Sequence, residues 1–148
     1  YKFKGDIMCS DSFHPKGDAA TQYNCEPYFD EKKPRLDPNY SFDLCRLGCC
    51  LFDYFVDELS EINTLVKKNQ IIALINDWVK DDKNRNVLYK TNGDERYPEF
   101  KLYKMIARTV HNNLPEKQLE KKIFSKFLIT DIPKKQKVIN IDKIPKMI

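Results

Sequence analysis

The chain has 148 residues, which is enough for one domain, and 41% of them are hydrophobic, which is enough to fill one core. Its 26 basic and 22 acidic residues are interspersed, so the net charge of +4 gives no support for nucleic-acid binding. No apolar run approaches the ~20 residues of a membrane span, and the first residues lack a basic-then-apolar signal segment. We therefore expect an intracellular protein that is not secreted and has no membrane span.

Residues 1–39 are rich in Gly, Pro, Asp, Asn and Ser and have no helical period, which predicts a long irregular segment. Irregular segments of this length are usually functional or disordered. Several aromatic residues argue that this one is ordered against a surface: Phe3, Phe13, Tyr23, Tyr28 and Phe29. Because the first residue is Tyr1 and not a methionine, we also expect the chain to be a fragment or the ordered part of a longer protein.

The most apolar predicted helix begins near residue 41. Ser41 or Asp43 can cap it, and for Asp43 the simplest interpretation is an N-terminal cap that the helix dipole favours. The apolar positions of this helix recur every three or four residues, at Leu44, Leu47, Gly48, Leu51, Phe52 and Phe55. The polar residues 58–70 predict a connection. A second, more exposed helix should follow, with an apolar face of Ile71, Leu74, Ile75 and Trp78.

A charged insert at residues 80–98 separates these helices from the rest. Within it, Val87-Leu88-Tyr89 precedes Asn92-Gly93, a pair suited to a tight turn, so we predict a short hairpin. A third helical stripe consists of Phe100, Tyr103, Ile106, Ala107 and Val110. A fourth helix should begin at Pro115 and carry Leu119, Ile123, Phe124 and Phe127.

The elements together predict a mainly α fold. It has an irregular N-terminal segment (1–39), a helical unit with a short hairpin insert (40–127) and a basic C-terminal tail (128–148). Within the tail, lysines surround the apolar residues 138–141, which we expect to add one extended edge segment.

The five cysteines do not form the pattern of a metal site or a disulfide framework. Their number is odd: Cys9, Cys25, Cys45, Cys49 and Cys50. The last three fall within six consecutive positions of the first predicted helix, which suits reduced, buried thiols. Zinc sites typically use C-x-x-C pairs, whereas Cys45 and Cys49 are four apart. Cys25 precedes Glu26, whose charge opposes thiolate formation, so we do not expect a cysteine nucleophile.

Other catalytic motifs are excluded by their spacing. The four glycines are too far apart to build a phosphate-cradling loop of the Walker or dinucleotide type. None of the serines has the flanking glycines of a nucleophile elbow. Most carboxylates are adjacent to lysines on predicted helix faces, which is typical of a solvated surface. We therefore expect no catalytic, cofactor-binding or metal-binding residue within this segment.

One run of residues resembles a known family. Asp43-Leu44-Cys45-Arg46-Leu47-Gly48-Cys49-Cys50-Leu51-Phe52 is similar to the D-x-W-S-L-G-C-x-L-[YF] pattern that begins the long central helix of the protein-kinase C-terminal lobe. Cys45 stands where many kinases have tryptophan, and Arg46 where they have serine. The resemblance implies a kinase-like helical C-lobe in which Asp43 is the structural anchor of the catalytic loop.

An upstream segment is similar to the end of a kinase activation segment: Thr21-Gln22-Tyr23-Asn24-Cys25-Glu26-Pro27. This resemblance implies that Thr21, Tyr23, Glu26 and Pro27 form a substrate-positioning loop and that Glu26 belongs to a structural ion pair. In this copy the Glu-Pro order is inverted, and the gap from threonine to tyrosine is one residue short.

A downstream segment resembles the last helices of the lobe through Lys104-Met105-Ile106, Pro115, Leu119 and Phe124. Asn113 and Leu114 occupy the region in which the usual arginine partner of the glutamate would stand. The resemblance therefore extends over about residues 18–127 and departs from the family pattern at one end of an expected ion pair.

The activity that this resemblance implies requires groups outside the segment. A glycine-rich loop, a strand lysine with its glutamate, a catalytic aspartate and asparagine, and a metal-binding D-F-G do not occur in this sequence. We expect the complete protein to bind ATP and Mg and to transfer phosphate to serine or threonine hydroxyls of proteins, while this segment alone binds no cofactor. The expected partners are the missing N-terminal part and a protein substrate.

The runs Y-S-F-D-L-C-R-L-G and K-L-Y-K-M-I-A-R-T-V-H-N are similar to serine/threonine kinases of nucleocytoplasmic large DNA viruses, which implies a location in the host cytoplasm, at the viral factory, or in the virion. A second hypothesis is a pseudokinase, that is, a catalytically inactive scaffold that binds viral structural proteins. The inverted Glu-Pro order and the missing arginine motivate it. A third is an unrelated helical interaction domain, which would lack a central buried helix with Asp43 at its base.

Overall fold

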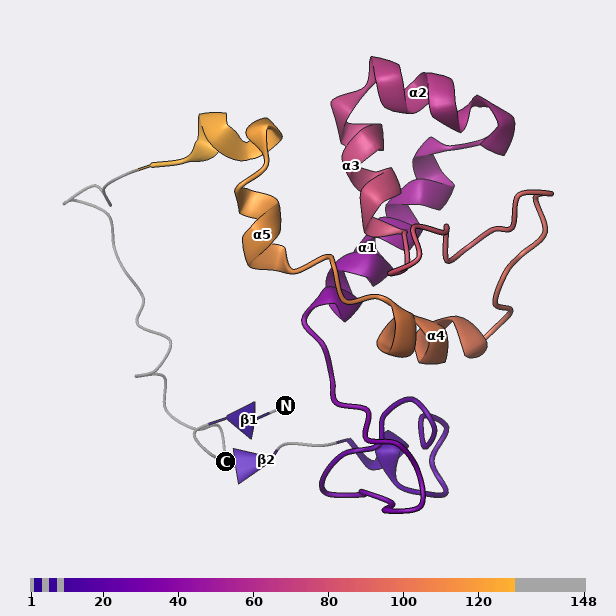
Figure 1. Ribbon diagram of the computed structural model, residues 1–148, viewed down its shortest axis with the longest axis vertical. Helices are drawn as coiled ribbons and strands as arrows, with labels where there is room; N and C mark the ends of the chain where they lie inside the picture. Colours follow the sequence, from indigo (N-terminus) through magenta and orange to yellow (C-terminus); the bar gives the residue numbers. More distant parts are fainter. Residues whose placement is uncertain (1, 4–5, 8–9, 130–148) are drawn as a thin grey trace.

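The computed structural model describes residues 2–3, 6–7 and 10–129 (Figure 1). This part of the chain is mainly helical, which confirms the predicted fold class at that level. The elements in chain order are β1 (Lys2–Phe3), β2 (Asp6–Ile7), a 3-10 turn (Asp11–Phe13), α1 (Ser41–Phe55), a 3-10 turn (Leu59–Glu61), α2 (Ile62–Lys68), α3 (Gln70–Trp78), α4 (Lys101–Thr109), α5 (Pro115–Leu119) and a 3-10 segment (Lys122–Phe127). The strands β1 and β2 form one short antiparallel pair.

Helix α1 packs mainly against α3, and its buried face agrees in part with the predicted one. The buried positions are Ser41, Cys45, Gly48, Cys49 and Phe52, of which Gly48 and Phe52 belong to the predicted apolar face. Leu47 and Phe55, which were predicted to be core residues, are 50% and 44% exposed. The small side chains face the core because the helices approach closely, so larger residues of the same helical period lie beside the contact and not within it.

The predicted capping of α1 by Ser41 or Asp43 was wrong. The N-cap residue is Tyr40, and it makes no side-chain capping bond. Ser41 is buried inside the first turn, and Asp43 lies exposed in that turn, where its charge is favourable to the helix dipole. The residues that lead into α1 are instead attached to α4, because the side-chain amide of Asn39 donates to the carbonyl of Ala107 at 3.0 Å.

The residues predicted to connect the first two helices form α2, with a 3-10 turn before it. The prediction was wrong because 58–70 also carries Leu59, Ile62 and Leu65, which pack against the core between polar neighbours. Helix α3 begins where Asn69 accepts hydrogen bonds from two backbone N–H groups. It was predicted to be more exposed than α1, but four of its nine residues are buried, compared with five of fifteen in α1. The buried residues of α3 are Ile72, Leu74, Ile75 and Trp78.

The insert at 80–98 contains turns and two isolated antiparallel β-bridges, and the pairing of residues 88–90 with residues 94–96 closes the predicted turn at Asn92-Gly93. The bridges join Lys80 to Asn86 and Tyr89 to Glu95. Gly93 has a φ of +87°, as the predicted tight turn requires. Val87 and Leu88 of the insert are buried and belong to the core.

The last helices divide into one that fits its prediction and one that does not. Ile106 and Ala107 in α4, and Val110 directly after it, are buried as predicted. The fourth helix is only five residues long, and Leu119, expected on its apolar face, is 70% exposed. The buried residue of α5 is Gln118, whose side-chain oxygen accepts a hydrogen bond from the indole of Trp78 at 3.0 Å.

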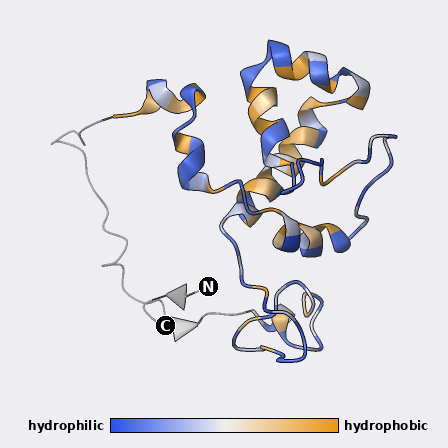
Figure 2. Ribbon diagram, viewed as in Figure 1, coloured by the Kyte–Doolittle hydropathy of each residue, from blue (hydrophilic) through white to orange (hydrophobic). Residues whose placement is uncertain are grey.

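The hydropathy pattern agrees with one helical core. Figure 2 shows hydrophobic and hydrophilic residues alternating around α1, α3 and α4. No helix in the described ranges is long and apolar enough to cross a membrane. The extended edge segment predicted at 138–141 lies outside the described residues.

Candidate functional site

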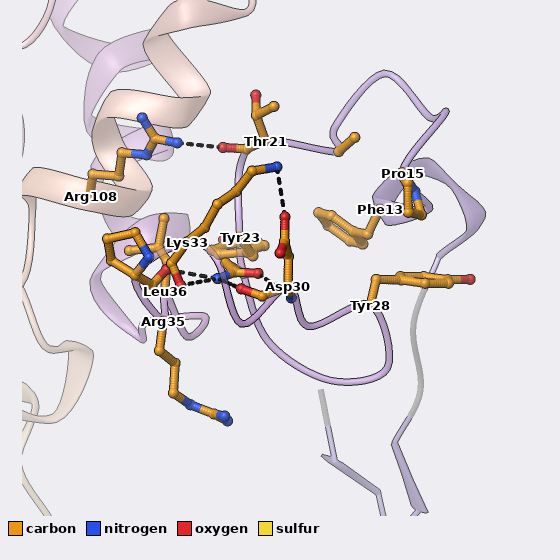
Figure 3. A pocket seen from close by; sticks show the side chains of 13 residues that line it. Phe13, Pro15, Thr21, Tyr23, Tyr28, Asp30, Lys33, Arg35, Leu36 and Arg108 are labelled. Carbon is orange, nitrogen blue, oxygen red and sulfur yellow. Dashed lines mark hydrogen bonds and ion pairs between the residues drawn. The ribbon is translucent and has the colours of Figure 1, made fainter.

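A cavity of about 580 Å³ lies between the N-terminal loop (residues 10–39) and the end of α4 (Figure 3). Its apolar lining includes Phe13, Pro15, Tyr23, Tyr28 and Leu36, and its charged lining includes Asp30, Lys33, Arg35 and Arg108. Cavities of this size, with mostly apolar walls and a few polar groups, are typical of ligand-binding sites. This combination makes the cavity the strongest candidate for a binding site in the described part of the chain.

One asparagine side chain organises the wall of the cavity. The amide of Asn24 donates to the backbone carbonyls of Asp30, Lys33 and Pro34 at 3.1, 3.0 and 2.8 Å. Its oxygen accepts from the backbone N–H of Asp30 at 2.9 Å, and its backbone pairs with that of Leu36 in both directions. Asn24 therefore closes residues 25–35 into one ordered excursion of the loop.

An ion pair holds the outer edge of the same excursion. The guanidinium of Arg35 donates to both carboxylate oxygens of Glu26, at 3.0 and 2.7 Å, and to Asp37 at 2.9 Å. These carboxylates raise the pKa of Arg35. Glu26 thus forms an ion pair with an arginine nine residues further along the loop, whereas the ion pair that the resemblance implies requires an arginine near residues 113–114, where the sequence has none.

A row of aromatic rings connects the cavity to the helices. The ring centroids of Phe13 and Tyr23 are 5.4 Å apart, and those of Tyr23 and Phe42 are 6.3 Å apart. The ring centroid of Phe42, in the first turn of α1, lies 6.3 Å from that of Tyr103. The ring centroid of Tyr103 lies in turn 5.1 Å from that of Phe100, near the start of α4. Because aromatic pairs at these separations attract one another, this aromatic row fixes the loop against both helices.

Tyr23 is the point at which the loop and α1 meet. Burial raises the pKa of its hydroxyl, and the charge of Asp43 raises it further, whereas a hydrogen bond with Gln22 opposes the change. Tyr23 therefore stays protonated and can donate a hydrogen bond to a bound group. Arg108 makes a second connection, because its guanidinium donates to the carbonyl of Thr21 at 2.8 Å (Figure 3).

The residues predicted for the site from the sequence are partly brought together. Thr21 and Tyr23 line the cavity. Glu26 is at the edge of the cavity, where it pairs with the lining residue Arg35. Pro27 follows Glu26 across a cis peptide bond. Asp43 is exposed on the α1 side of Tyr23.

Three residues of the site were missed in the sequence. Asn24 belongs to a stretch rich in turn residues, and this was its only signal. Arg35 and Arg108 had none, because a single arginine in a charged sequence is typical of a solvated surface. Arg108 contacts Thr21, which is 87 positions earlier in the sequence, and local sequence patterns do not report contacts between residues so far apart in the chain.

No group of three or more His, Cys, Asp or Glu side chains within the described ranges is arranged to hold a metal ion. Comparisons with family models, with curated proteins and with solved structures found no match for this chain.

Proposed function

We propose that this chain is the helical C-lobe portion of a serine/threonine protein kinase, and that its loop cavity positions a protein substrate for phosphoryl transfer by the complete protein. The observation that carries the proposal is the position of Tyr23, which lines the cavity and contacts Phe42 in the first turn of α1. Asp43 lies close enough for its charge to raise the pKa of Tyr23. The two segments that resemble a kinase, 21–27 and 43–52, therefore meet at this tyrosine.

The chemistry of the cavity suits a peptide better than a nucleotide. Its aromatic and proline side chains offer apolar contact, and its cations are largely engaged, since Lys33 pairs with Asp30 at 3.3 Å and Arg35 with Glu26. ATP and Mg would bind to the other part of the protein, where the groups for phosphoryl transfer are expected. The loop would contribute by orienting the hydroxyl-bearing segment of the substrate.

A phosphoryl-transfer assay on the intact protein that contains this chain tests the proposal. With radiolabelled ATP and Mg, the wild-type protein should label serine or threonine in a protein substrate. Asp43→Asn should lower the rate by about 100-fold, the scale at which misplaced reacting groups lose activity. Asp57→Asn, an exposed aspartate just beyond the same helix, is the matched control and should leave the rate unchanged. Absence of transfer by the wild-type protein would refute the enzymatic function.

A second candidate is a catalytically inactive kinase-like scaffold that binds viral structural proteins. The pairing of Glu26 with Arg35 inside one loop favours it, because the loop then keeps its shape without the arginine that the family pattern places near 113–114. Such a loop is a self-contained binding element. Recovery of the protein at fixed stoichiometry from purified virus particles, with no phosphoryl transfer, would support this candidate, and its recovery only as an active enzyme from infected cells would exclude it.

A further inference from the structure

Three cations line the loop cavity, and they differ in whether a carboxylate neutralises them. Lys33 pairs with Asp30 at 3.3 Å. Arg35 donates through both terminal nitrogens to the carboxylate of Glu26. Arg108, in contrast, forms no ion pair with any residue in the described ranges. Because an unpaired charge sets the potential of the surface around it, the cavity is positive at the end where Arg108 enters.

The loop itself holds the Arg108 side chain at the cavity. Arg108 lies in the last turn of α4, and its guanidinium donates to the backbone carbonyl of Thr21 at 2.8 Å. A guanidinium carries five N–H groups in a planar fork, so this one bond leaves an edge of the fork for an anion. Since the bond to Thr21 already fixes the side chain, little further side-chain entropy is lost when an anion binds.

The other end of the cavity is apolar. Figure 3 shows Phe13, Pro15 and Tyr28 on the side away from Arg108. Aromatic and proline walls of this kind suit a large apolar side chain, and a small anion alone would leave them uncovered. The occupant that matches both ends therefore carries an apolar group and an anionic group a short distance apart, as a peptide segment can.

We propose that Arg108 selects peptides in which an anionic side chain, a carboxylate or a phosphate, stands close to a large apolar residue. The apolar residue fills the aromatic end of the cavity, and the anion binds the free edge of the guanidinium. The inference rests on the proposed function in one respect, namely that the selected peptide is the substrate. Arg108 is then a specificity-determining residue, which discriminates against a basic peptide by charge repulsion and takes no part in phosphoryl transfer.

Fluorescence anisotropy with labelled peptides and the 148-residue chain, without ATP, tests the preference. Each peptide contains one phenylalanine and, one to three positions away, a glutamate, a phosphoserine, a glutamine or a lysine. The better of the two anionic peptides should bind about tenfold more tightly than the glutamine peptide, the scale of one hydrogen bond to a charged group. The lysine peptide should bind most weakly. The order of the two anionic peptides tells whether the site takes a carboxylate or a phosphate.

Two variants show whether the preference comes from Arg108. Arg108→Gln should bind the anionic and the glutamine peptides equally, whereas Arg108→Lys, which keeps the charge and loses the fork, should retain part of the preference. Lys101→Gln is the matched control, because it removes one exposed cation from the start of the same helix. Its preference should equal that of the wild type, which separates a local contact from the attraction of a chain with a net charge of +4.

Several results would overturn the inference: no binding of any peptide by the wild-type chain, equal binding of its anionic and glutamine peptides, or an unchanged preference in Arg108→Gln. If circular dichroism shows that Arg108→Gln is unfolded, Arg108→Lys decides, and a preference equal to that of the wild type would then exclude recognition by the fork.

Phosphoryl transfer by the intact protein is measured separately, on the same peptides with a serine beside the phenylalanine. If the binding preference is present but no peptide is phosphorylated, the proposed enzymatic function fails and Arg108 belongs to a docking site for anionic peptides. If the anionic and glutamine peptides are phosphorylated with equal kcat/KM, selection by Arg108 fails and the enzymatic function stands. The two failures are therefore distinguishable.

Discussion

A Cβ atom added to Gly48 in α1 would lie 2.8 Å from the Cβ atom of Trp78 in α3. No rotation of the tryptophan side chain can relieve this contact, because the Cβ position is fixed by the backbone. Glycine at position 48 therefore sets the distance between the two main core helices.

Gly48→Ala should destabilise the chain even though alanine favours helices more than glycine does. The gain in helix propensity is about 1 kcal/mol, whereas overpacking in a core costs about 1–3 kcal/mol. We expect the melting temperature to fall, as measured by circular dichroism. Cys50→Ala, at an exposed position of the same helix, is the control and should have little effect. An unchanged melting temperature for Gly48→Ala would mean that α1 and α3 can separate without cost.

Gln118→Met should weaken the attachment of α5 to α3. The methionine has a similar size, but it leaves the buried indole N–H of Trp78 without its acceptor, at a cost of about 1–3 kcal/mol. Urea unfolding should therefore show a lower midpoint. Gln70→Met replaces an exposed glutamine and should leave the midpoint in place. Equal midpoints for both variants would show that the hydrogen bond contributes nothing.

Asn24→Ala should open the loop excursion at residues 25–35 without unfolding the helices. The substitution removes three hydrogen bonds donated by the amide and one accepted by it, each with a net contribution of about 1 kcal/mol. Trypsin should then cleave faster after Lys32 and Arg35, while the melting temperature of the helices changes little. Asn63→Ala, at an exposed position in α2, should leave cleavage unchanged.

Asp81 should make the stability of the insert depend on pH in the acid range. Burial opposes ionisation of Asp81, but hydrogen bonds from Arg85 and from the backbone N–H groups of Lys83 and Arg85 prevail, so the pKa of Asp81 is lowered. A carboxyl with a lowered folded-state pKa stabilises the fold above its unfolded pKa of about 3.9, and this contribution is lost as the pH falls through the folded-state value.

The stability of the wild-type chain should therefore decrease on acidification below about pH 4, and Asp81→Asn should remove this part of the pH dependence. At pH 7 the variant should be less stable by about 1–3 kcal/mol. The side chain at position 81 is buried, and the amide of the introduced asparagine cannot accept all four hydrogen bonds that the carboxylate accepts. Unfolding by urea at pH 7 and pH 3 measures both effects. Asp57→Asn is the exposed control, and identical pH profiles for Asp81→Asn and wild type would contradict the assignment.

The periodicity of the sequence was enough to locate α1, α3 and α4, because each carries an apolar face of adequate length. It failed in part at the closest helix contact. Cys45, Gly48 and Cys49 are buried as expected, but Leu47, expected in the core, is exposed, since close helix approach selects for size and not for hydrophobicity. Gln118 is buried for its hydrogen bond to Trp78, which hydrophobic periodicity cannot predict.

The candidate site was predicted in its local part only. The segment 21–27 was assigned to a substrate-positioning loop from its resemblance to a kinase activation segment. Thr21 and Tyr23 of this segment line the cavity, and the substrate-positioning role stays a prediction. The partner of Glu26 was expected near 113–114, whereas Arg35 fills that role from within the loop. An ion pair can form with any arginine that the backbone brings within reach, and the loop geometry that brings Arg35 there depends on Asn24.

Trp78 is the single tryptophan of the sequence, and it lies at the contact between α3 and α5. The cavity loop and its aromatic row contain phenylalanine and tyrosine but no tryptophan. Intrinsic tryptophan emission is thus a native, label-free reporter of α5 detachment that does not respond directly to an occupant of the loop cavity. Changes in tyrosine absorbance without a change in tryptophan emission would distinguish an event at the loop from an opening of the helical core.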